Sequence, residues 1–396
     1  MATSRAASDR RRFLRLGTAA TGVALGGCSA EPPARAGSSA PVMRYRRLGG
    51  TRLAVSEIAF GAHGIENAPL MGAAFEAGIT TFCTSGQYLD GREEESLGEA
   101  IRRVGAPRDR LVIITGNRTP PGTSRRAILE AIDASLHRLR TDHIDVYYTG
   151  EVCSPADLRV EALFEAFAEA KRGGKVGHLA MSGHCGGMQP ALNAAIDDGR
   201  FEMLFTRYDF VSYPDQDGIL RRAADRGLGA IVFKVTAGNR QREIEDLQKG
   251  GLSFRQAAVK WAHGHPYVSS VAVTMTSFDD LREMTAAAGS RLTEAEAQML
   301  GRYAARMHDQ YCRFCGTCEA ACPHGVAVAD VMRYAMYFAD YGREKRALEL
   351  YDALTRERRA AACDGCPAPC DAACPFGRKV RAGLRAAHRQ LSFSHA

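Results

Sequence analysis

The chain has no long basic block and no long apolar run. Its 396 residues carry a formal net charge of +7, and residues 1–27 hold five Arg and one Asp, so only +3 belongs to the rest of the chain. Such a balance leaves no electrostatic footprint for nucleic acid. The apolar stretch 17–27 is too short and too rich in Gly to cross a bilayer as a helix. Nucleic-acid binding therefore has no support, and this stretch is not a membrane-spanning helix.

A glycine-rich phosphate motif is also missing. Candidate strands alternate with segments whose apolar residues recur at helical spacing, among them 124–138, 156–172 and 253–263. The candidate strands are 57–60, 79–83, 111–115, 144–148, 176–181, 203–205, 229–233 and 270–273. Eight strand–helix units over about 250 residues are typical of an α/β fold of the (β/α)8 TIM barrel type. A doubly wound sheet is the alternative, but the G-x-G-x-x-G motif expected after its first strand is absent.

Cysteine is concentrated in two runs near the C-terminus. The first run follows the spacing C-x2-C-x2-C-x3-C-P, and the second has one extra residue between its second and third Cys. The cysteines are Cys312, Cys315, Cys318 and Cys322 in the first run, and Cys363, Cys366, Cys370 and Cys374 in the second. The first spacing holds iron–sulfur clusters in bacterial ferredoxins. Two such runs predict two [4Fe–4S] clusters and therefore one-electron chemistry.

The last cysteine of each run is expected to serve the other cluster. A Pro follows it and turns the chain away, so Cys374 would complete the first set and Cys322 the second. Structural zinc and disulfides are the alternatives, although zinc usually takes its four ligands as two pairs. The composition of the bound metal would separate these alternatives.

The N-terminus has the features of an export signal. Arg11 and Arg12 form a twin-arginine pair. The sequence Leu25-Gly-Gly-Cys28 resembles a lipobox, which implies that Cys28 is acylated and becomes the first mature residue. A disordered tail with a chance Arg cluster is the alternative. We expect export by the twin-arginine pathway to the periplasmic side of the membrane as a lipoprotein, with residues 28–43 as a flexible tether.

Five segments of the middle region carry a resemblance to a known family. They are Arg46-Arg-Leu-Gly-Gly-Thr-Arg-Leu-Ala-Val-Ser-Glu-Ile-Ala-Phe-Gly61, Gly78-Ile-Thr-Thr-Phe-Cys-Thr-Ser-Gly-Gln-Tyr88, Glu95-Ser-Leu-Gly98, His143-Ile-Asp-Val-Tyr147 and Gly174-Lys-Val-Gly-His-Leu-Ala-Met-Ser182. Together they resemble aldo-keto reductases. The cysteine-rich part resembles a branch of that family with a C-terminal ferredoxin-like domain. The resemblance implies a barrel of aldo-keto reductase type and hydride transfer from NADPH to a carbonyl.

The catalytic residues that the resemblance implies are only partly present. In the family a tyrosine gives the proton, an aspartate–lysine pair lowers its pKa, and a histidine orients the substrate. This chain has Tyr88, but Cys83, Gly116 and Gly150 stand at the aspartate, lysine and histidine positions. A tyrosine without a nearby cation has a pKa near 10 and is a weak general acid. The tetrad is therefore degenerate.

Other residues could serve the barrel mouth. The resemblance implies that Ser182 contacts the nicotinamide of NADP(H), with Gly183 where an asparagine is expected. Lys234 ends the seventh strand and would be a cation for substrate or cofactor, or else a salt-bridged surface residue. Together with Tyr88 and His184 it makes the set of candidate catalytic residues.

Cysteines and histidines also follow several barrel strands. Cys83, Cys153, Cys185, His63 and His184 lie at or just beyond the carboxyl ends of strands one, two, four and five. Barrels place active sites at that face. One hypothesis is that some of them converge as a thiol or metal site. The alternative is that the cysteines are buried as small apolar residues and the histidines are structural.

The sequence predicts four parts. They are a signal (1–27), a tether (28–43), an aldo-keto reductase-like barrel (44–290) and a helical domain with two clusters (291–396), whose segment 379–388 is a helix with a basic face. That face would dock an acidic redox partner or simply be solvated. The predicted function is an exported iron–sulfur oxidoreductase that passes electrons between a redox partner protein or membrane electron donor and the barrel mouth. The alternatives are a non-catalytic barrel that serves as a docking platform for an electron carrier, and an NADPH-dependent carbonyl reductase.

Overall fold

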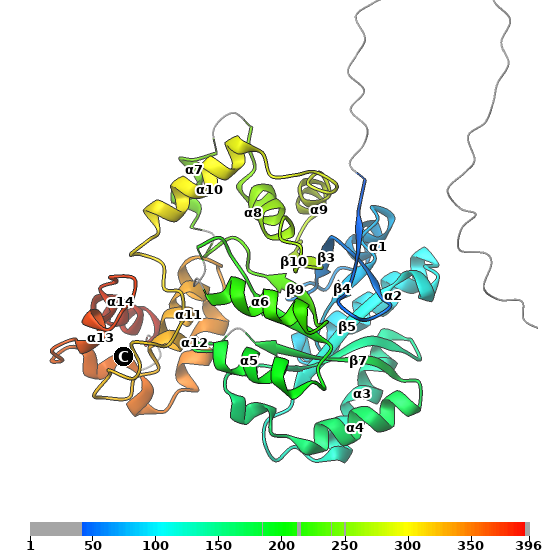
Figure 1. The fold of residues 1–396 in the computed structure, drawn as a ribbon, viewed down its shortest axis with the longest axis horizontal. Helices are drawn as coiled ribbons and strands as arrows, with labels where there is room; N and C mark the ends of the chain where they lie inside the picture. Colours follow the sequence, from blue (N-terminus) through cyan, green and yellow to red (C-terminus); the bar gives the residue numbers. More distant parts are fainter. Residues whose placement is uncertain (1–41, 184, 212–214, 239, 249–250, 393–396) are drawn as a thin grey trace, which may run out of the picture. The chain divides into compact units, whose positions relative to one another are not determined.

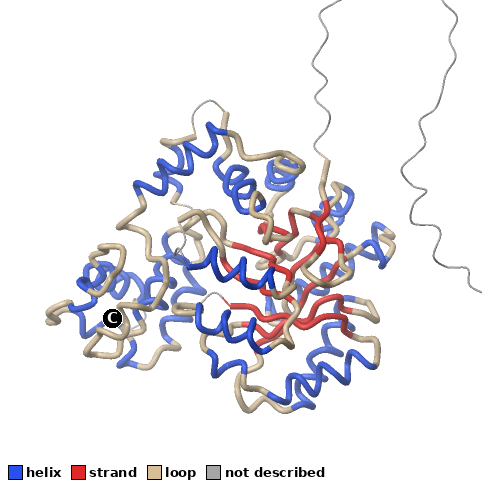
Figure 2. The backbone as a smooth tube through the Cα atoms, viewed as in Figure 1, coloured by secondary structure: helices blue, strands red, loops and turns tan. Residues whose placement is uncertain are grey.

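Eight parallel strands close into a barrel in the order β10-β3-β4-β5-β6-β7-β8-β9 (Figures 1 and 2). The computed structural model describes residues 42–392 except 184, 212–214, 239 and 249–250, so the predicted signal lies outside the described residues. The strands are β3 Ile58–Gly61, β4 Thr81–Cys83, β5 Val112–Arg118, β6 Ile144–Gly150, β7 Val176–Gly183, β8 Met203–Arg207, β9 Gly229–Phe233 and β10 Ser270–Thr274. Each overlaps one predicted strand. The predicted barrel is confirmed, and the doubly wound sheet is wrong.

Alternate side chains of the strands fill the barrel. Val112 and Ile114 of β5, with Val146 and Tyr148 of β6, belong to the interior cluster. Ile113 belongs instead to the layer between the strands and the helices. This alternation follows from the pleat of a strand, and it makes the barrel a packed core rather than a channel.

A hairpin packs against the amino end of the barrel. Strands β1 Tyr45–Arg47 and β2 Ala54–Ser56 pair antiparallel. Leu48, in the turn, is fully buried in the interior cluster. Gly49 has a φ of +52°, and a Cβ there would lie 2.2 Å from the backbone nitrogen of Gly229, the first residue of β9. The hairpin therefore approaches β9 so closely that only Gly fits. It was not among the predicted elements.

Helices form the layer around the strands. Their bounds are α1 Ala68–Glu76, α2 Arg92–Val104, α3 Arg125–Leu139, α4 Glu161–Arg172, α5 Gln189–Asp198, α6 Asp215–Asp225, α7 Gln241–Glu245, α8 Phe254–His263 and α9 Phe278–Thr285. The predicted helix 156–172 is divided into a 3-10 turn, Pro155–Leu158, and α4. The break lies at Arg159, whose φ of −84° and ψ of 56° are not helical.

Helices alone make up the regular structure after β10. Helix α10 Glu294–Arg306 contacts the barrel helix α8, with Lys260 donating to Glu296 at 2.7 Å. Four further α-helices follow in the described residues: α11 Val328–Ala339, α12 Glu344–Asp352, α13 Pro369–Ala372 and α14 Val380–Leu391. Two short 3-10 turns lie between α12 and α13. Helix α11 packs against both α12 and α14. The barrel and these helices belong to one compact unit.

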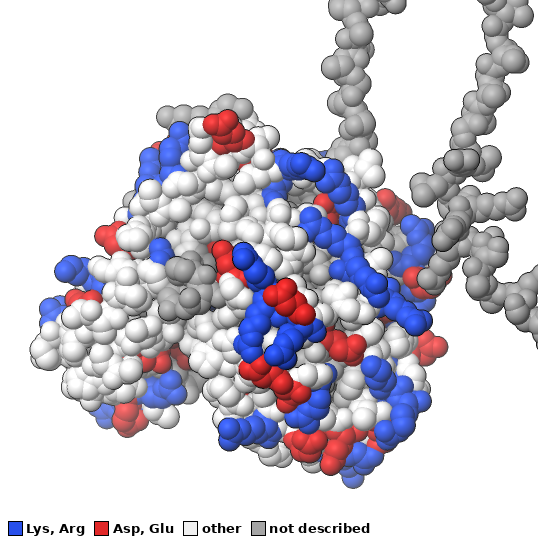
Figure 3. All heavy atoms as spheres, viewed as in Figure 1, with Lys and Arg blue, Asp and Glu red and all other residues white. Residues whose placement is uncertain are grey.

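The described surface has a mixed charge. On the face drawn in Figure 3, Lys and Arg are interspersed with Asp and Glu. Many of them form exposed ion pairs, such as Arg126 with Glu130 and Lys175 with Asp133. Within residues 42–392, as far as they are described, none of the helices combines the length and the apolarity needed to cross a bilayer.

Candidate functional site

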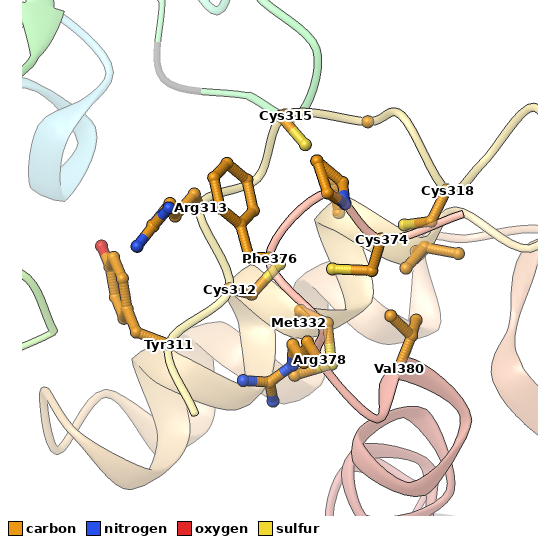
Figure 4. A pocket seen from close by; sticks show the side chains of 14 residues that line it. Tyr311, Cys312, Arg313, Cys315, Cys318, Met332, Cys374, Phe376, Arg378 and Val380 are labelled. Carbon is orange, nitrogen blue, oxygen red and sulfur yellow. The ribbon is translucent and has the colours of Figure 1, made fainter. Parts of the chain in front are cut away.

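Four cysteines from distant parts of the chain line one cavity. Cys312, Cys315 and Cys318 come from the first run and Cys374 ends the second (Figure 4). The cavity has an empty volume of about 420 Å³, which includes space open to solvent. Figure 4 shows the four side chains around the same space, with Met332 of α11 on one side. Three neighbouring cysteines and one remote cysteine thus form a first set.

The other four cysteines form a second set. Burial, with the charges of Cys322, Cys370 and Cys366, raises the pKa of Cys363 to about 11. The pKa of Cys370 is raised by burial, by Asp371 and again by Cys322 and Cys366. Cys322 belongs to the first run in sequence but lies with the second run in space. The two sets are those that the spacing predicted; that they bind clusters stays a prediction.

The environment of each cysteine set disfavours ionisation of the thiols. Burial raises the pKa of Cys318 far above its ordinary value, and the charges of Cys312, Cys315 and Cys374 raise it further. Four thiolates in one place repel one another unless a cationic centre offsets their charge, and a bound metal removes the thiol protons for this reason. The donor chemistry of both sets therefore fits an iron–sulfur cluster.

Left-handed residues shape both cysteine loops. Phe314 and Gly316 have φ of 53° and 76° between the cysteines of the first run. In the second run Ala368 has a φ of 63°. This alanine lies within the longer spacing between Cys366 and Cys370, so a tight turn absorbs the extra residue. A left-handed non-glycine residue costs about 1–2 kcal/mol, which the surrounding loop must offset.

Disulfides do not join the cysteines of either set. All eight are free thiols in the described part of the chain. No group of three or more His, Cys, Asp or Glu side chains among the described residues converges on one metal ion. A zinc ion needs four ligands at about 2.3 Å from one centre, whereas each cysteine of a [4Fe–4S] cluster binds a different iron. The wider grouping of each set suits the cluster better than zinc.

Arginines surround the first set. Arg313 and Arg378 both line its cavity, and the Arg313 guanidinium lies 3.8 Å from the ring centroid of Phe376. Arg207, at the carboxyl end of β8, donates to the backbone carbonyl of Arg313. The barrel and the first cysteine loop are therefore in direct contact. Gly187 adds a second link, since its N–H donates to the carbonyl of Phe314 at 2.8 Å.

Basic residues of α14 hold the second cysteine loop. Arg381 donates to the carbonyl of Cys366 at 2.5 Å, and Arg385 to Asp364 at 2.5 Å. These are two of the side chains of the predicted basic face. Their contacts explain them as supports of the cysteine loop, and docking of a partner stays a prediction.

Tyr88 lies in the 3-10 turn Tyr88–Gly91 after β4. Its ring stacks on that of His63, with centroids 4.4 Å apart. Burial and the Glu93 carboxylate raise its pKa well above the ordinary value, and the hydroxyl of Tyr148 lowers it only in part. Tyr88 is therefore a protonated phenol at neutral pH, without the lowered pKa that general acid catalysis needs.

Two positions that the resemblance assigns to larger residues are sterically closed. A Cβ on Gly116 would lie 2.0 Å from the carbonyl oxygen of Tyr148, and a Cβ on Gly183 would lie 2.5 Å from that of Val152. Real Cβ atoms do not approach so closely, so the strands would have to move. A lysine at residue 116 could not be restored beside Tyr88 in this backbone.

Lys234 binds a tyrosine from the cysteine-rich region. Its ammonium donates to the hydroxyl of Tyr337 at 2.6 Å and lies 4.6 Å from the centroid of that ring. Arg333, one turn earlier in α11, reaches the same hydroxyl at 3.5 Å. Burial raises the pKa of Tyr337, but Lys234 and Arg333 outweigh it and lower this pKa to about 8. Lys234 is therefore partly buried and paired with a side chain of α11. Its role as a cation for substrate or cofactor stays a prediction.

Other mouth residues also contact the cysteine-rich region. Arg343 donates to Nε2 of His63 at 2.7 Å. Because an arginine can only donate, that nitrogen accepts and the imidazole is neutral. Burial, Arg343 and Lys234 lower the pKa of His63 to about 3. Glu93 accepts a bond from the N–H of Gly64, and burial raises its pKa to about 8.

The predicted thiol or metal site at the mouth is wrong in its cysteine part. Cys153 and Cys185 form a disulfide, with their Cα atoms 5.3 Å apart. Cys83 is a separate buried thiol whose pKa burial raises far above its ordinary value. His63 is engaged by Arg343, and His184 lies outside the described residues. The disulfide joins the loops after β6 and β7, and neither cysteine is available as a thiolate ligand.

The loop after β10 does not fit a dinucleotide phosphate. Barrels often bind phosphate at this place. Here Thr276 donates both its N–H (2.8 Å) and its hydroxyl (2.7 Å) to Asp280. The first turn of helix α9 contains Asp279 and Asp280, whose charges would repel an anion at that end. Ser182, the predicted nicotinamide contact, is buried in β7.

Comparisons with known proteins agree with the barrel. The aldo/keto reductase family model matches residues 65–246. Over these residues the barrel is similar to the aldo/keto reductase family. The cysteine runs lie beyond the matched residues.

Individual relatives are distant. A versiconal hemiacetal acetate reductase from Aspergillus parasiticus is 26% identical over 333 residues, which cover 65% of this chain and 96% of the relative. A probable voltage-gated potassium channel subunit beta from Oryza sativa subsp. japonica is 33% identical over 137 residues, 31% of this chain and 42% of that protein. A holo aldo-keto reductase structure from Bacillus halodurans superposes with a TM-score of 0.56 at 21% identity, covering 66% of this chain and 96% of the other. That structure supports the fold alone.

The residues that α11 brings to the mouth were not predicted from the sequence. Arg333 and Tyr337 are about 100 residues from Lys234 in sequence, 103 in the case of Tyr337. The spacing of the aromatic and basic residues of α11 predicts a helix, but the neighbouring sequence does not indicate that they contact Lys234. Glu93 was missed as well, and its only signal was a run of three Glu at the start of α2.

Proposed function

We propose that this chain is an iron–sulfur oxidoreductase of the aldo/keto reductase family, which holds two [4Fe–4S] clusters and transfers single electrons. The grouping of the cysteines carries the proposal. In each of two places, three cysteines of one run meet the last cysteine of the other. Cys312, Cys315, Cys318 and Cys374 would hold one cluster, and Cys322, Cys363, Cys366 and Cys370 the other.

The first set lies against the barrel, which supports transfer between the two. Its loop receives hydrogen bonds from Arg207 of β8 and from Gly187. The clusters, when bound, supply one-electron steps; the protein contributes burial and the surrounding arginines. Positive charge near a cluster favours its reduced form, since reduction adds negative charge. The first cluster is expected to be the one that faces the barrel mouth, because its loop contacts Arg207 and Gly187.

Side chains of the cysteine-rich region form hydrogen bonds with residues at the barrel mouth. Lys234 is bound by Tyr337, and His63 by Arg343. Substrate chemistry at this mouth would have to proceed beside these contacts or after they open. The alternative of a barrel that serves as a docking platform, with the clusters as an electron carrier, gains support from them.

A carbonyl reductase that uses NADP(H) is the second candidate. Similarity to the family favours it, and matched relatives are named as reductases. The residues present do not fit the dinucleotide well, because Gly183 is closed to the expected asparagine and Asp280 occupies the donors of the loop after β10.

The proposed compartment rests on the N-terminal sequence alone. A twin-arginine signal would export the folded protein with its clusters in place, and lipid on Cys28 would hold it at the periplasmic side of the membrane. Its redox partner would then be a periplasmic protein or a membrane electron donor. Labelling with a radioactive fatty acid, lost in a Cys28→Ala variant, would test the anchor.

The deciding experiment is an anaerobic analysis of the protein made without its signal. We expect iron and acid-labile sulfide in the ratio of two cubane clusters, and loss of visible absorbance when dithionite is added. Zinc in place of iron would refute the proposal. Addition of NADPH tests the second candidate in the same sample: if NADPH reduces the clusters, the barrel binds a nicotinamide; if only dithionite does, the donor is another protein.

A further inference from the structure

Helix α11 connects the first cysteine set to the barrel mouth. Val328, Ala329 and Met332 line the cavity of that set (Figure 4). The next residue, Arg333, contacts the hydroxyl of Tyr337, which lies one turn later in α11. Tyr337 in turn contacts Lys234 at the barrel mouth. One helix therefore presents one face to the proposed cluster and another to a group of buried ionisable side chains.

The hydroxyl of Tyr337 lies within hydrogen-bonding distance of two basic side chains. Lys234 donates to it at 2.6 Å and Arg333 reaches it at 3.5 Å, while the residue is only 8% exposed. Arg333 is in turn paired with Asp330 at 2.8 Å. The two cations outweigh burial and bring the pKa of Tyr337 to about 8. Burial also lowers the pKa of Lys234, and the interaction with Tyr337 opposes that shift.

Three other phenols that interact with Tyr337 stay protonated. Tyr341 stacks on it with ring centroids 6.1 Å apart. Burial raises the pKa of Tyr341, of Tyr334 and of Tyr88, which all interact with Tyr337. Tyr337 is thus the phenol of this group that titrates near neutral pH, because it has the two cations.

We propose that Tyr337 is a proton-coupling site for the cluster held by Cys312, Cys315, Cys318 and Cys374. The inference rests on the proposed function. When a low-potential one-electron donor reduces the cluster, the cluster gains one electron and the Tyr337 phenolate gains one proton from water. On oxidation the electron leaves to an acceptor and the hydroxyl returns its proton to water.

The coupling follows from Coulomb's law. Met332 lines the cavity of the first set, and five residues of helix separate it from Tyr337, a rise of about 7.5 Å. A cluster in that cavity would lie on the order of 10 Å from the hydroxyl. An added negative charge at about 10 Å, with an effective dielectric constant of about 20, strengthens proton binding roughly tenfold. Below about pH 8 the phenol is protonated in both redox states. From there to about one pH unit higher, where the phenol of the reduced state ionises in turn, reduction takes up a proton and the potential falls by up to about 59 mV in total.

The test is a potentiometric titration of the cluster-loaded protein at several pH values, followed by electron paramagnetic resonance. In the unaltered chain we expect a constant potential at low pH and a decline that begins near pH 8. Tyr337→Phe should abolish the decline. Tyr341→Phe is the matched control, because it removes a hydroxyl from the same cluster of rings and should leave the decline unchanged.

A second variant keeps the test decisive if Tyr337→Phe does not fold. Lys234→Met should move the start of the decline to higher pH, since it removes the nearest cation from the phenolate. A reducible cluster whose potential does not change with pH, or an unchanged decline in Tyr337→Phe, overturns the inference. Absence of any iron–sulfur signal overturns the proposed function instead, so the two failures are distinguishable.

Discussion

The pairing of Lys234 with Tyr337 allows a quantitative prediction that needs no assumption about clusters. The pKa of Tyr337 is about 8, and its ordinary value is 10. Each unit of pKa corresponds to about 1.4 kcal/mol, so the fold favours the ionised phenol by about 3 kcal/mol. Lys234 is the larger of the two cationic causes. Lys234→Met should therefore return this pKa to about 10 or above, because burial and Arg333 remain.

The assay is a pH titration of protein that contains tyrosine labelled with ¹³C at the hydroxyl-bearing ring carbon. Its nuclear magnetic resonance signal moves when the phenol ionises, and a Tyr337→Phe spectrum assigns it. Lys234→Arg is the matched control, because it keeps the charge and should keep the pKa near 8. A Tyr337 signal that titrates at 10 or above in the unaltered chain, or that stays near 8 in Lys234→Met, would contradict this prediction.

The same shift fixes the sign of a stability effect. The folded pKa of Tyr337 lies below its ordinary value, so ionisation stabilises the fold above about pH 10. This contribution is lost as the pH falls through about 8. The difference in unfolding free energy between the unaltered chain and Tyr337→Phe should grow between these two pH values, and urea denaturation would measure it.

Three further predictions follow from other parts of the structure. Cys374→Ser should deplete one cluster and Cys322→Ser the other, so each variant should keep about half of the iron, and a variant that loses none would contradict the grouping. Gly116→Ala should lower the free energy of unfolding by about 3 kcal/mol or more, because its Cβ would lie 2.0 Å from a backbone oxygen of the next strand. Gly218→Ala, a helical position with open space around it, is the matched control and should not destabilise in thermal denaturation. Burial raises the pKa of Glu93 from 4.5 to about 8, so the folded carboxyl holds its proton more tightly and the free energy of unfolding should fall as the pH rises through this window. Glu93→Gln should flatten that dependence in denaturation curves, and an unchanged slope would show that Glu93 ionises normally.

Local sequence patterns predicted much of the fold. All eight barrel strands were predicted within a few residues of their observed bounds, because strands buried on both sides are short apolar runs between helices. Breaks were harder to see. The predicted helix 156–172 is interrupted at Arg159, where a Pro, Ser and Asp turn precedes the helix. The hairpin around Leu48 was missed, since its two strands have only three residues each.

The cysteine grouping was visible for a different reason. The spacing of a cluster motif is a geometric constraint along the chain, so Cys312, Cys315 and Cys318 had to face one side. Their fourth partner, Cys374, could be predicted only because the motif itself includes a cysteine that reaches the other set. No such rule linked Cys153 with Cys185, and their disulfide emerges only from the approach of two barrel loops.

The sequence by itself determined the barrel, the two cysteine sets and the vacant positions of the catalytic tetrad. These depend on period, spacing and residue type, which are properties of short stretches. Only the tertiary structure decided which side chains meet at the barrel mouth and how they ionise. It brought Tyr337 to Lys234 across 103 residues and closed Gly116 against Tyr148. Among the described residues it placed no cation where it lowers the pKa of Tyr88. A pKa depends on burial and on charges within a few ångströms, and distance in space cannot be read from distance along the chain.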